Sequence, residues 1–429
     1  MFDAKTYEKR MEWFNRDRFG MFIHWGLYAI PARGEWVRSK ERISLSDYQK
    51  YFGAFNPSRF DPAEWAKLAK EAGMKYAVLT AKHHDGFCLF DSKYTDYKST
   101  NTPMGRDIVR EYIDAFRAEG IRTGLYYSLL DWRHPDYPHF TDNIHPMRGN
   151  PEHKDEDRSF GNYLEYMHNQ VKELCTDYGK IDLMWFDFSY DHLTGEAWRA
   201  SDLMRMVRRL QPDIIIDDRL EYGSALYAPE RKTVYSGDYA SPEQVIPPNG
   251  LRDENGRPAA WEACVTMNNN WGYNSTDNYW KPADMLIRKL VECVSKGGNM
   301  LLNVGPDANG AIPEASVQIL RDISRWMSKN GESIYGCGPS GMDKPEFGRI
   351  TKRGNTLYYH VTENTVGPLP LIGIDIQNIK SISFLDSGAE ILTASEWYTK
   401  QAEGVVMADL GPDPVLPDRA DTVVKVELI

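Results

Sequence analysis

Short apolar runs alternate with amphipathic segments over the first three quarters of the chain. The apolar runs are rich in β-forming residues and too short for helices, and their unbroken apolar character is typical of parallel strands covered on both faces. These predicted strands span residues 21–26, 76–82, 123–128, 181–187, 214–219 and 300–304. Between them, apolar residues three and four positions apart predict helices. The predicted helices span 62–73, 107–121, 163–178, 196–210, 284–295 and 315–330.

This alternation of strand and helix indicates βαβ units and therefore a parallel sheet. Several units precede any change in composition, which favours a (β/α)8 barrel, of the TIM type, over an open doubly wound sheet. The first strand is not followed by a GxGxxG motif, which disfavours a dinucleotide-binding sheet. We expect the barrel to occupy residues 1–335.

The pattern changes in the last quarter of the chain. Apolar and polar residues alternate with period two, interrupted by Gly, Asn and Pro, in the segments 350–363, 372–376, 382–387, 396–400 and 422–429. Such short strands without helices predict a small antiparallel β-sandwich, which we place at residues 345–429. The glycine-rich stretch 336–345 is the predicted junction.

Composition excludes several classes of partner and compartment. The 429 residues carry 62 Asp and Glu against 51 Lys and Arg, a net charge of −11. This balance argues against binding to nucleic acid or to an anionic membrane. No apolar stretch approaches the ~18 residues of a membrane span, and the first residues lack the apolar core of a signal peptide. We expect a cytoplasmic protein if Met1 is the native start, and a periplasmic or secreted one if a signal peptide was removed.

The five cysteines are scattered and include no CxxC pair. They indicate buried thiols in a reducing compartment, without a disulfide framework or a zinc site.

Candidate chemistry follows from the barrel, because functional groups of such barrels lie at the carboxyl ends of the strands. Two carboxylates facing one cleft, ringed by Trp and His, are what glycoside hydrolysis needs. Asp187 is the strongest candidate, because it ends an apolar strand and emerges at the barrel mouth. The alternative is a structural aspartate that caps the next helix or pairs with an arginine.

Two further features concern a sugar pocket. His83 and His84 are adjacent, and consecutive strand residues point to opposite faces, so they do not ordinarily ligate one metal ion unless the strand bends. Hydrogen bonds to sugar hydroxyls are favoured instead. Trp36 and Trp271 lie in polar, loop-like surroundings, where their flat faces are able to line a pocket.

Seven motifs occur in order: RFGMFIHWGLY, YAVLTAKHHDGFCLFDS, GLYYSLLDW, LMWFDF, GDYASPEQ, WEACVTMNNNWGYN and KGGNMLLNVGPDANGAIP. Together they resemble the α-L-fucosidases of glycoside hydrolase family 29 over residues 15–335. The resemblance implies an irregular (β/α)8 barrel followed by a β-sandwich. It also implies a retaining double displacement without metal or cofactor, acting on fucosylated oligosaccharides or glycoconjugates.

The resemblance also assigns roles to individual residues. Asp187 matches the nucleophile, and Arg219 matches a basic residue near the site. The residues that match positions holding the fucose ring are His24, Glu35, Trp36, His83 and His84. Tyr127 and Trp271 match further pocket positions, with Trp271 against the C5 methyl group.

The general acid/base is best matched by Glu243, with Glu262 and Glu35 as alternatives. Its motif GDYASPEQ resembles the subgroup that prefers α-1,3/1,4-linked fucose. We expect Asp187 near an arginine or other hydrogen-bond donors, and Glu243 partly desolvated or beside another carboxylate. The carboxyl groups of a retaining enzyme lie about 5–5.5 Å apart.

Two other functional classes are possible for this chain. One is a fucose-binding module without catalysis, and the other is a metal-dependent sugar isomerase. The presence of both Asp187 and Glu243 favours the hydrolase.

Overall fold

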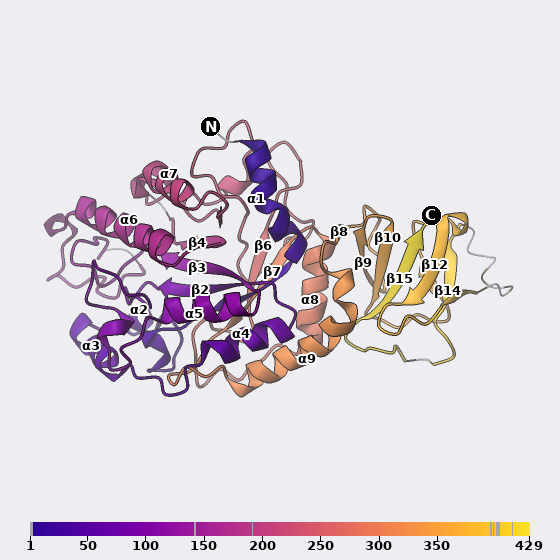
Figure 1. The fold of residues 1–429 in the computed structure, drawn as a ribbon, viewed down its shortest axis with the longest axis horizontal. Helices are drawn as coiled ribbons and strands as arrows, with labels where there is room; N and C mark the ends of the chain where they lie inside the picture. The colour runs from indigo at the N-terminus through magenta and orange to yellow at the C-terminus, as the bar shows by residue number, and fades with distance from the viewer. Residues whose placement is uncertain are drawn as a thin grey trace.

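The computed structural model describes residues 3–140, 143–190, 192–394, 397, 399, 404–413 and 415–429. Its first part is built on a curled sheet of parallel strands in the order β5-β4-β3-β2-β1-β7-β6 (Figure 1). These strands are β1 Phe19–Ile23, β2 Tyr76–Lys82, β3 Arg122–Ser128, β4 Leu183–Asp187, β5 Ile215–Ile216, β6 Glu262–Thr266 and β7 Asn299–Val304.

An irregular segment fills the gap between the two edge strands β5 and β6. Single parallel bridges join Asp217 to Tyr239 and Ala240 to Trp261, and a third joins Glu243 to Cys264. Residues 238–244, which we call the closing segment, therefore occupy the place of an eighth strand. The prediction of an irregular parallel barrel followed by a small β-sandwich is confirmed.

Helices pack on the outer face of the sheet (Figure 1). Those of the barrel are α1 Ala4–Asp17, α2 Val37–Lys40, α3 Leu45–Ala54, α4 Pro62–Glu71, α5 Ile108–Ala118, α6 Phe160–Asp177, α7 Ala200–Leu210, α8 Ala283–Ser295 and α9 Glu314–Asn330. Single-turn 3-10 helices lie at Leu27–Ala29, Ser99–Asn101, Asp155–Asp157, Gly195–Trp198, Ser224–Leu226, Gly331–Ser333 and Ile376–Asn378. Five of the six predicted helices are confirmed, and the sixth, 196–210, is divided at Arg199 into the 3-10 turn Gly195–Trp198 and α7. Helices α1, α2 and α3 and strand β6 were not predicted.

Helix α5 illustrates why the helical predictions succeed. Its N-cap residue Asp107 accepts a hydrogen bond from the backbone N–H of Arg110, which satisfies one of the free donors of the first turn. Val109, Tyr112 and Phe116 are buried on one face. An apolar stripe of this kind makes burial against the sheet, rather than intrinsic propensity, the main source of helix stability.

Strand side chains alternate between the barrel interior and the helices. The interior is filled by a cluster that includes Phe22, Tyr126, Trp185 and Tyr239. Their chain neighbours, such as Tyr127, belong to the cluster that packs against the helices. This period of two decides which residue of each pair is able to reach the barrel mouth.

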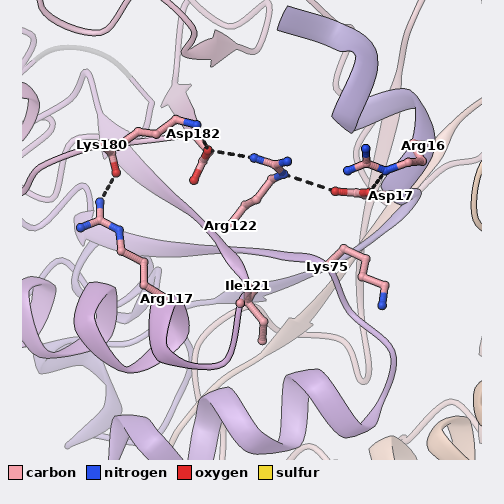
Figure 2. A pocket seen from close by; sticks show the side chains of 9 residues that line it. Arg16, Asp17, Lys75, Arg117, Ile121, Arg122, Lys180 and Asp182 are labelled. Atoms are coloured by element: carbon pink, nitrogen blue, oxygen red, sulfur yellow. Dashed lines mark hydrogen bonds and ion pairs between the residues drawn. The ribbon is translucent and has the colours of Figure 1, made fainter.

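The amino end of the barrel is closed by α1, whose residues Trp13 and Phe14 pack on the interior ring of Tyr76. Beside it lies a polar pocket of about 790 Å³. There, Arg122 bridges Asp17 and Asp182 at 3.4 and 3.3 Å (Figure 2). These ion pairs join the starts of β1, β3 and β4, so they brace the end of the barrel opposite the strands' carboxyl ends.

The C-terminal part consists of two antiparallel sheets. One has the order β12-β15-β10-β9-β8 and the other β11-β14-β13. Their bounds are β8 Gly338–Pro339, β9 Gly348–Arg353, β10 Thr356–Val361, β11 Leu369–Leu371, β12 Ile379–Phe384, β13 Leu392–Thr393, β14 Val406–Asp409 and β15 Thr422–Leu428. The predicted strand 396–400 falls on a stretch in which 396, 398 and 400 lie outside the described residues.

The sandwich packs on helices of the barrel (Figure 1). The indole N–H of Trp326 in α9 donates to the carbonyl of Asp421 at 2.9 Å. Asp421 Oδ2 in turn lies 2.6 Å from Nδ1 of the fully buried His360 on β10. The two parts therefore share a buried polar contact.

All five cysteines are buried and unpaired, as predicted. Within the described ranges, no helix combines the length and apolar character that crossing a membrane requires.

Candidate active site

One arginine connects two carboxylates at the carboxyl ends of the strands. Nη1 of Arg219, which follows β5, lies 3.2 Å from Oδ1 of Asp187 at the end of β4. Nη2 of the same side chain lies 3.1 Å from Oε2 of Glu243 on the closing segment. The two carboxylates therefore lie no farther apart than one guanidinium and its two hydrogen bonds allow.

Arg219 is itself held in place. Its Nε donates to Ser241 Oγ at 2.9 Å, and its Nη2 donates to the carbonyl of Ser241 at 3.1 Å. The guanidinium also lies 4.8 Å from the ring centroid of Trp185. Contacts on both its edge and its face leave the arginine little freedom to turn away from the carboxylates.

Asp187 lies among hydrogen-bond donors, as predicted. The hydroxyl of Tyr126 donates to Asp187 Oδ2 at 2.7 Å, and His84 Nε2 lies 3.8 Å from the same oxygen. Burial raises the pKa of Asp187 to about 6, an effect that Arg219 and then Tyr126 oppose and Glu243 reinforces. A carboxylate with these partners ionises near neutral pH although most of its side chain is buried.

Glu243 lies at the rim of the barrel. Its Oε1 accepts a hydrogen bond from the indole N–H of Trp271 at 3.2 Å, and 44% of its side chain is exposed. As expected for this residue, its side chain is partly desolvated and a second carboxylate, Asp187, lies on the same arginine. A molecule bound against Trp271 and Arg219 would exclude water from it.

The strand bends where the two adjacent histidines follow β2. The register between β2 and β3 shifts between Thr80 and Lys82, which is the signature of a bulge that re-aims the residues after it. As a result the rings of His83 and His84 lie 4.2 Å apart instead of on opposite faces. His84 Nδ1 is 2.7 Å from Ser128 Oγ, and His83 stacks on Tyr126 at 5.5 Å.

His24, after β1, is oriented by an asparagine that sequence reasoning missed. Oδ1 of Asn303 on β7 lies 2.7 Å from His24 Nδ1, and Nδ2 of Asn303 donates to the carbonyl of Trp271 at 2.7 Å. Burial lowers the pKa of His24 to about 3. The imidazole is therefore neutral, with its proton on Nδ1 and Nε2 left as an acceptor. The parallel register of β1 and β7, which pairs Phe22 with Asn303, brings Asn303 to His24. The sequence alone does not reveal that register.

Loops after β1 and β6 meet at Glu35 and Gly272. Glu35 is buried, and its Oε2 accepts the backbone N–H of Gly272 at 2.8 Å. A Cβ atom at position 272 would lie 2.8 Å from the ring of Tyr28, so glycine is required for this approach. Trp36 and Trp271 are thereby placed on two sides of the cluster, 5.1 Å from His84 and His24 respectively.

The prediction of Tyr127 as a pocket residue is wrong by one position. The hydroxyl of Tyr127 donates to Gln170 on α6 at 2.8 Å, and its ring lies under the ammonium group of Lys82 at 4.4 Å. It faces the helices because side chains alternate along β3. Its neighbour Tyr126 faces the interior and reaches Asp187.

The alternative acid/base Glu262 is also wrong. It begins β6 and pairs in register with Asn299, the first residue of β7, so it lies at the amino end of the barrel while Asp187 lies at the carboxyl end. Its carboxyl group is buried and accepts a hydrogen bond from Tyr76. Glu35, the other alternative, does lie on the side of the barrel that carries Asp187, but it is engaged with Gly272.

Glu262→Gln is expected to raise the melting temperature by a few degrees at pH 8 and to change it little at pH 5. Burial raises the pKa of Glu262 in the folded chain to about 8, whereas an unfolded glutamate ionises near ~4.3. Between these values the unfolded chain releases its proton and the folded chain does not, so stability falls as pH rises. Glutamine removes this loss because it does not ionise.

Calorimetry of the variant at the two pH values measures this effect. Glu8→Gln, a change of an exposed glutamate on α1, serves as the control. An equal gain at both pH values would contradict the role assigned to ionisation. Because Glu262 lies at the end of the barrel opposite Asp187, its replacement should leave catalysis nearly unchanged, with kcat/KM for an aryl glycoside within about twofold of that of the unaltered chain.

Among the residues that the structure describes, no group of three or more His, Cys, Asp or Glu side chains is arranged to hold a metal ion. Burial lowers the pKa of His83 and His84 as it does that of His24, so the carboxyl end of the barrel presents a guanidinium-bridged carboxylate pair, three neutral histidine rings and two tryptophans.

Comparison with known proteins identifies the family. A family model described as alpha-L-fucosidase matches residues 2–332. The alpha-L-fucosidase of Dictyostelium discoideum is 30% identical over 355 residues, which cover 76% of this chain and 72% of that protein. The tissue alpha-L-fucosidase of Bos taurus is 30% identical over 378 residues, which cover 81% and 72%.

Solved structures agree with this result. Alpha-L-fucosidase isoenzyme 1 from Paenibacillus thiaminolyticus is 54% identical and superimposes with a TM-score of 0.96, covering 99% of this chain and 100% of that chain. A GH29 alpha-L-fucosidase from Bacteroides thetaiotaomicron, solved as a trapped covalent intermediate, is 31% identical with a TM-score of 0.84, covering 98% and 96%. The chain therefore belongs to the alpha-L-fucosidase family, glycoside hydrolase family 29.

Proposed function

We propose that the chain is a retaining exo-α-L-fucosidase in which Asp187 is the nucleophile and Glu243 the general acid/base. The observation that supports this most directly is the single guanidinium of Arg219 between the two carboxylates. It holds them on one side of the barrel, at a separation compatible with the ~5–5.5 Å of retaining enzymes. The barrel of residues 1–335 would carry the reaction.

In the first step an oxygen of Asp187 attacks C1 of the fucose while the bond from C1 to the leaving oxygen breaks. Glu243 gives its proton to that oxygen, so the leaving group departs as a neutral alcohol. The product is a β-fucosyl ester of Asp187. Tyr126 and Arg219, which contact the carboxylate in the free chain, disperse the charge of Asp187 before and after the attack.

In the second step the ionised Glu243 removes a proton from water as the water oxygen attacks C1. The bond to Asp187 breaks, the aspartate regains its charge, and α-L-fucose is released. Two inversions at C1 give net retention. Glu243 is then protonated again, ready for the next substrate.

Sugar binding would use the residues around the carboxylates. The neutral rings of His24, His83 and His84 offer acceptors and donors for the hydroxyl groups. The faces of Trp36 and Trp271 offer apolar surface, with Trp271 the wall for the C5 methyl group. Removing one buried partner of a hydroxyl should weaken fucose binding by about 1–3 kcal/mol.

Following the products of an aryl α-L-fucoside by proton NMR tests this function. A retaining enzyme releases α-L-fucose first, and the β-anomer appears later by mutarotation. Release of the β-anomer first would reject the retaining mechanism, and fucose binding without turnover would favour the non-catalytic module. Loss of activity in EDTA would favour a metal-dependent reaction, because the proposed steps require no metal or cofactor.

We further propose a preference for α-1,3/1,4-linked fucose in branched glycans. The motif that carries Glu243 supports this, and the exposure of residues 243–245 at the barrel rim leaves space around Glu243 for a branch. Fucose should be released faster from a Lewis-type trisaccharide than from an α-1,2-fucosyl disaccharide. The reverse order of kcat/KM would reject this preference.

The pH profile should report the ionisation of Asp187. Because the nucleophile must be ionised, the acidic limb of the kcat/KM profile should rise with pH around the pKa of about 6 that burial gives this group. Tyr126→Phe removes a hydrogen bond that lowers this pKa, so the acidic limb should move to higher pH. A limb that does not move would contradict the assignment of Asp187 to it.

A further inference from the structure

The residues that follow the two carboxylates have unusual backbones. Phe188 follows Asp187 with φ of 82°, and Gln244 follows Glu243 with φ of 55°. Residues with a Cβ atom seldom adopt this left-handed conformation, and they keep it where surrounding contacts impose it.

Three hydrogen bonds tie Gln244 to strand β6. Its backbone N–H donates to the carbonyl of Cys264 at 2.9 Å, and its side-chain Nε2 donates to Thr266 Oγ1 at 2.8 Å. The backbone N–H of Thr266 donates to Gln244 Oε1 at 3.3 Å. The nitrogen and the oxygen of the Gln244 side-chain amide therefore both form hydrogen bonds with Thr266 on the buried strand β6.

The anchoring residue is itself fixed. Thr266 is 1% exposed, and its carbonyl and hydroxyl oxygens accept hydrogen bonds from Lys281 Nζ at 2.7 and 3.2 Å. Gln244 is thus attached to a buried and hydrogen-bonded residue of the barrel.

Glu243 depends on this attachment because its own surroundings are open. The residues 243, 244 and 245 are all exposed, so little packing holds this stretch. The left-handed turn at Gln244 lets its amide reach Thr266 while the preceding carboxylate reaches Arg219 and Trp271. Without the side-chain anchor, the peptide between the two residues keeps its backbone hydrogen bond to Cys264 but loses both contacts with Thr266.

We propose that Gln244 is a positioning residue that fixes Glu243 for proton transfer. This inference rests on the proposed function of Glu243 as acid/base. It predicts a loss of rate only where proton transfer matters, because the hydrogen bonds described for Gln244 go to Cys264 and Thr266 and not to Asp187 or the residues proposed to bind the sugar.

The test compares leaving groups. Phenyl α-L-fucoside needs a proton on its leaving oxygen, whereas 2-chloro-4-nitrophenyl α-L-fucoside leaves as a stable phenolate. Gln244→Asn keeps a residue that tolerates the left-handed backbone but is too short to span to Thr266. We expect its kcat/KM to fall about tenfold for the phenyl substrate and less than about twofold for the activated one.

Thr266→Val removes the hydroxyl that accepts a hydrogen bond from Gln244 Nε2. Its kcat/KM should likewise fall more for the phenyl substrate than for the activated one. Gln49→Asn, a change of an exposed glutamine on α3, is the matched control. The melting temperature of each variant shows whether it is folded. Because two different variants break the same contact, the test still decides if one of them does not fold.

Equal losses for both substrates in the two variants, or no loss in either, would overturn the role of Gln244. Glu243→Gln is measured beside them. If it shows the leaving-group dependence and the Gln244 and Thr266 variants do not, only the positioning role is wrong. If Glu243→Gln itself lacks the dependence, the acid/base assignment is wrong, and the positioning role with it.

Discussion

Asp187→Ala is expected to lower kcat/KM for an aryl α-L-fucoside by about four orders of magnitude, because the variant lacks the carboxylate that forms the fucosyl ester. Asp187 is the carboxylate that Tyr126 and Arg219 both contact. Azide, which is small enough to occupy the space left by the side chain, should restore turnover. The product should be β-fucosyl azide, because a single inversion then replaces two.

Asp213→Ala is the matched control, since Asp213 is exposed and lies shortly before β5. Its activity should be unchanged, and both variants should melt cooperatively. A rate for Asp187→Ala within about tenfold of the unaltered chain, or a lack of azide product, would reject Asp187 as nucleophile.

The second large effect concerns the proton donor. Glu243→Gln should lower kcat/KM for phenyl α-L-fucoside by about two to three orders of magnitude, because amide nitrogen does not protonate the leaving oxygen. The loss should shrink for the 2-chloro-4-nitrophenyl substrate. Azide should here give α-fucosyl azide, because it attacks an ester that Asp187 has already formed.

The opposite anomers of the two azide products separate the roles of Asp187 and Glu243. Glu230→Gln, a change of a mostly exposed carboxylate, controls for removal of a charge. Glu35→Gln tests the remaining alternative, since Glu35 lies on the side of the barrel that carries Asp187. If Glu35→Gln shows the leaving-group dependence and Glu243→Gln does not, the acid/base is Glu35.

The parallel barrel was predictable because buried strands and amphipathic helices have distinct periods. The prediction of β2 matches its bounds, Tyr76–Lys82, since that strand is mostly apolar and every one of its residues is buried. The closing segment was not recognised as a strand. It pairs through single bridges, so it has neither the length nor the alternation that signals a strand.

The candidate site was predictable where a residue directly ends a strand, as Asp187 does. It was not predictable where a shift of one position along a strand decides whether a side chain faces the barrel interior or the helices. Tyr126 and Tyr127 are identical in type, and only the register of β3 with β4 determines which one faces Asp187. At the end of β2 a bulge cancels the same alternation, so both histidines reach one side.

Contacts between segments far apart in the chain could not be predicted from the sequence, for a different reason. Asn303 orients His24 across 279 positions, and Arg219 joins carboxylates from two different places in the chain. Such pairs are created by closure of the barrel, which brings the ends of all strands together. A single sequence contains the residues but not their proximity.

The most direct measurement is the site of covalent labelling by 2-deoxy-2-fluoro-fucosyl fluoride. Its fluorine at C2 slows both formation and hydrolysis of the ester, and the fluoride leaving group at C1 offsets the slower formation, so the intermediate should accumulate. Mass spectrometry of peptic fragments should find one fucosyl group per chain, esterified to Asp187. A label on any other residue, or hydrolysis of the reagent with no ester formed, would contradict the mechanism.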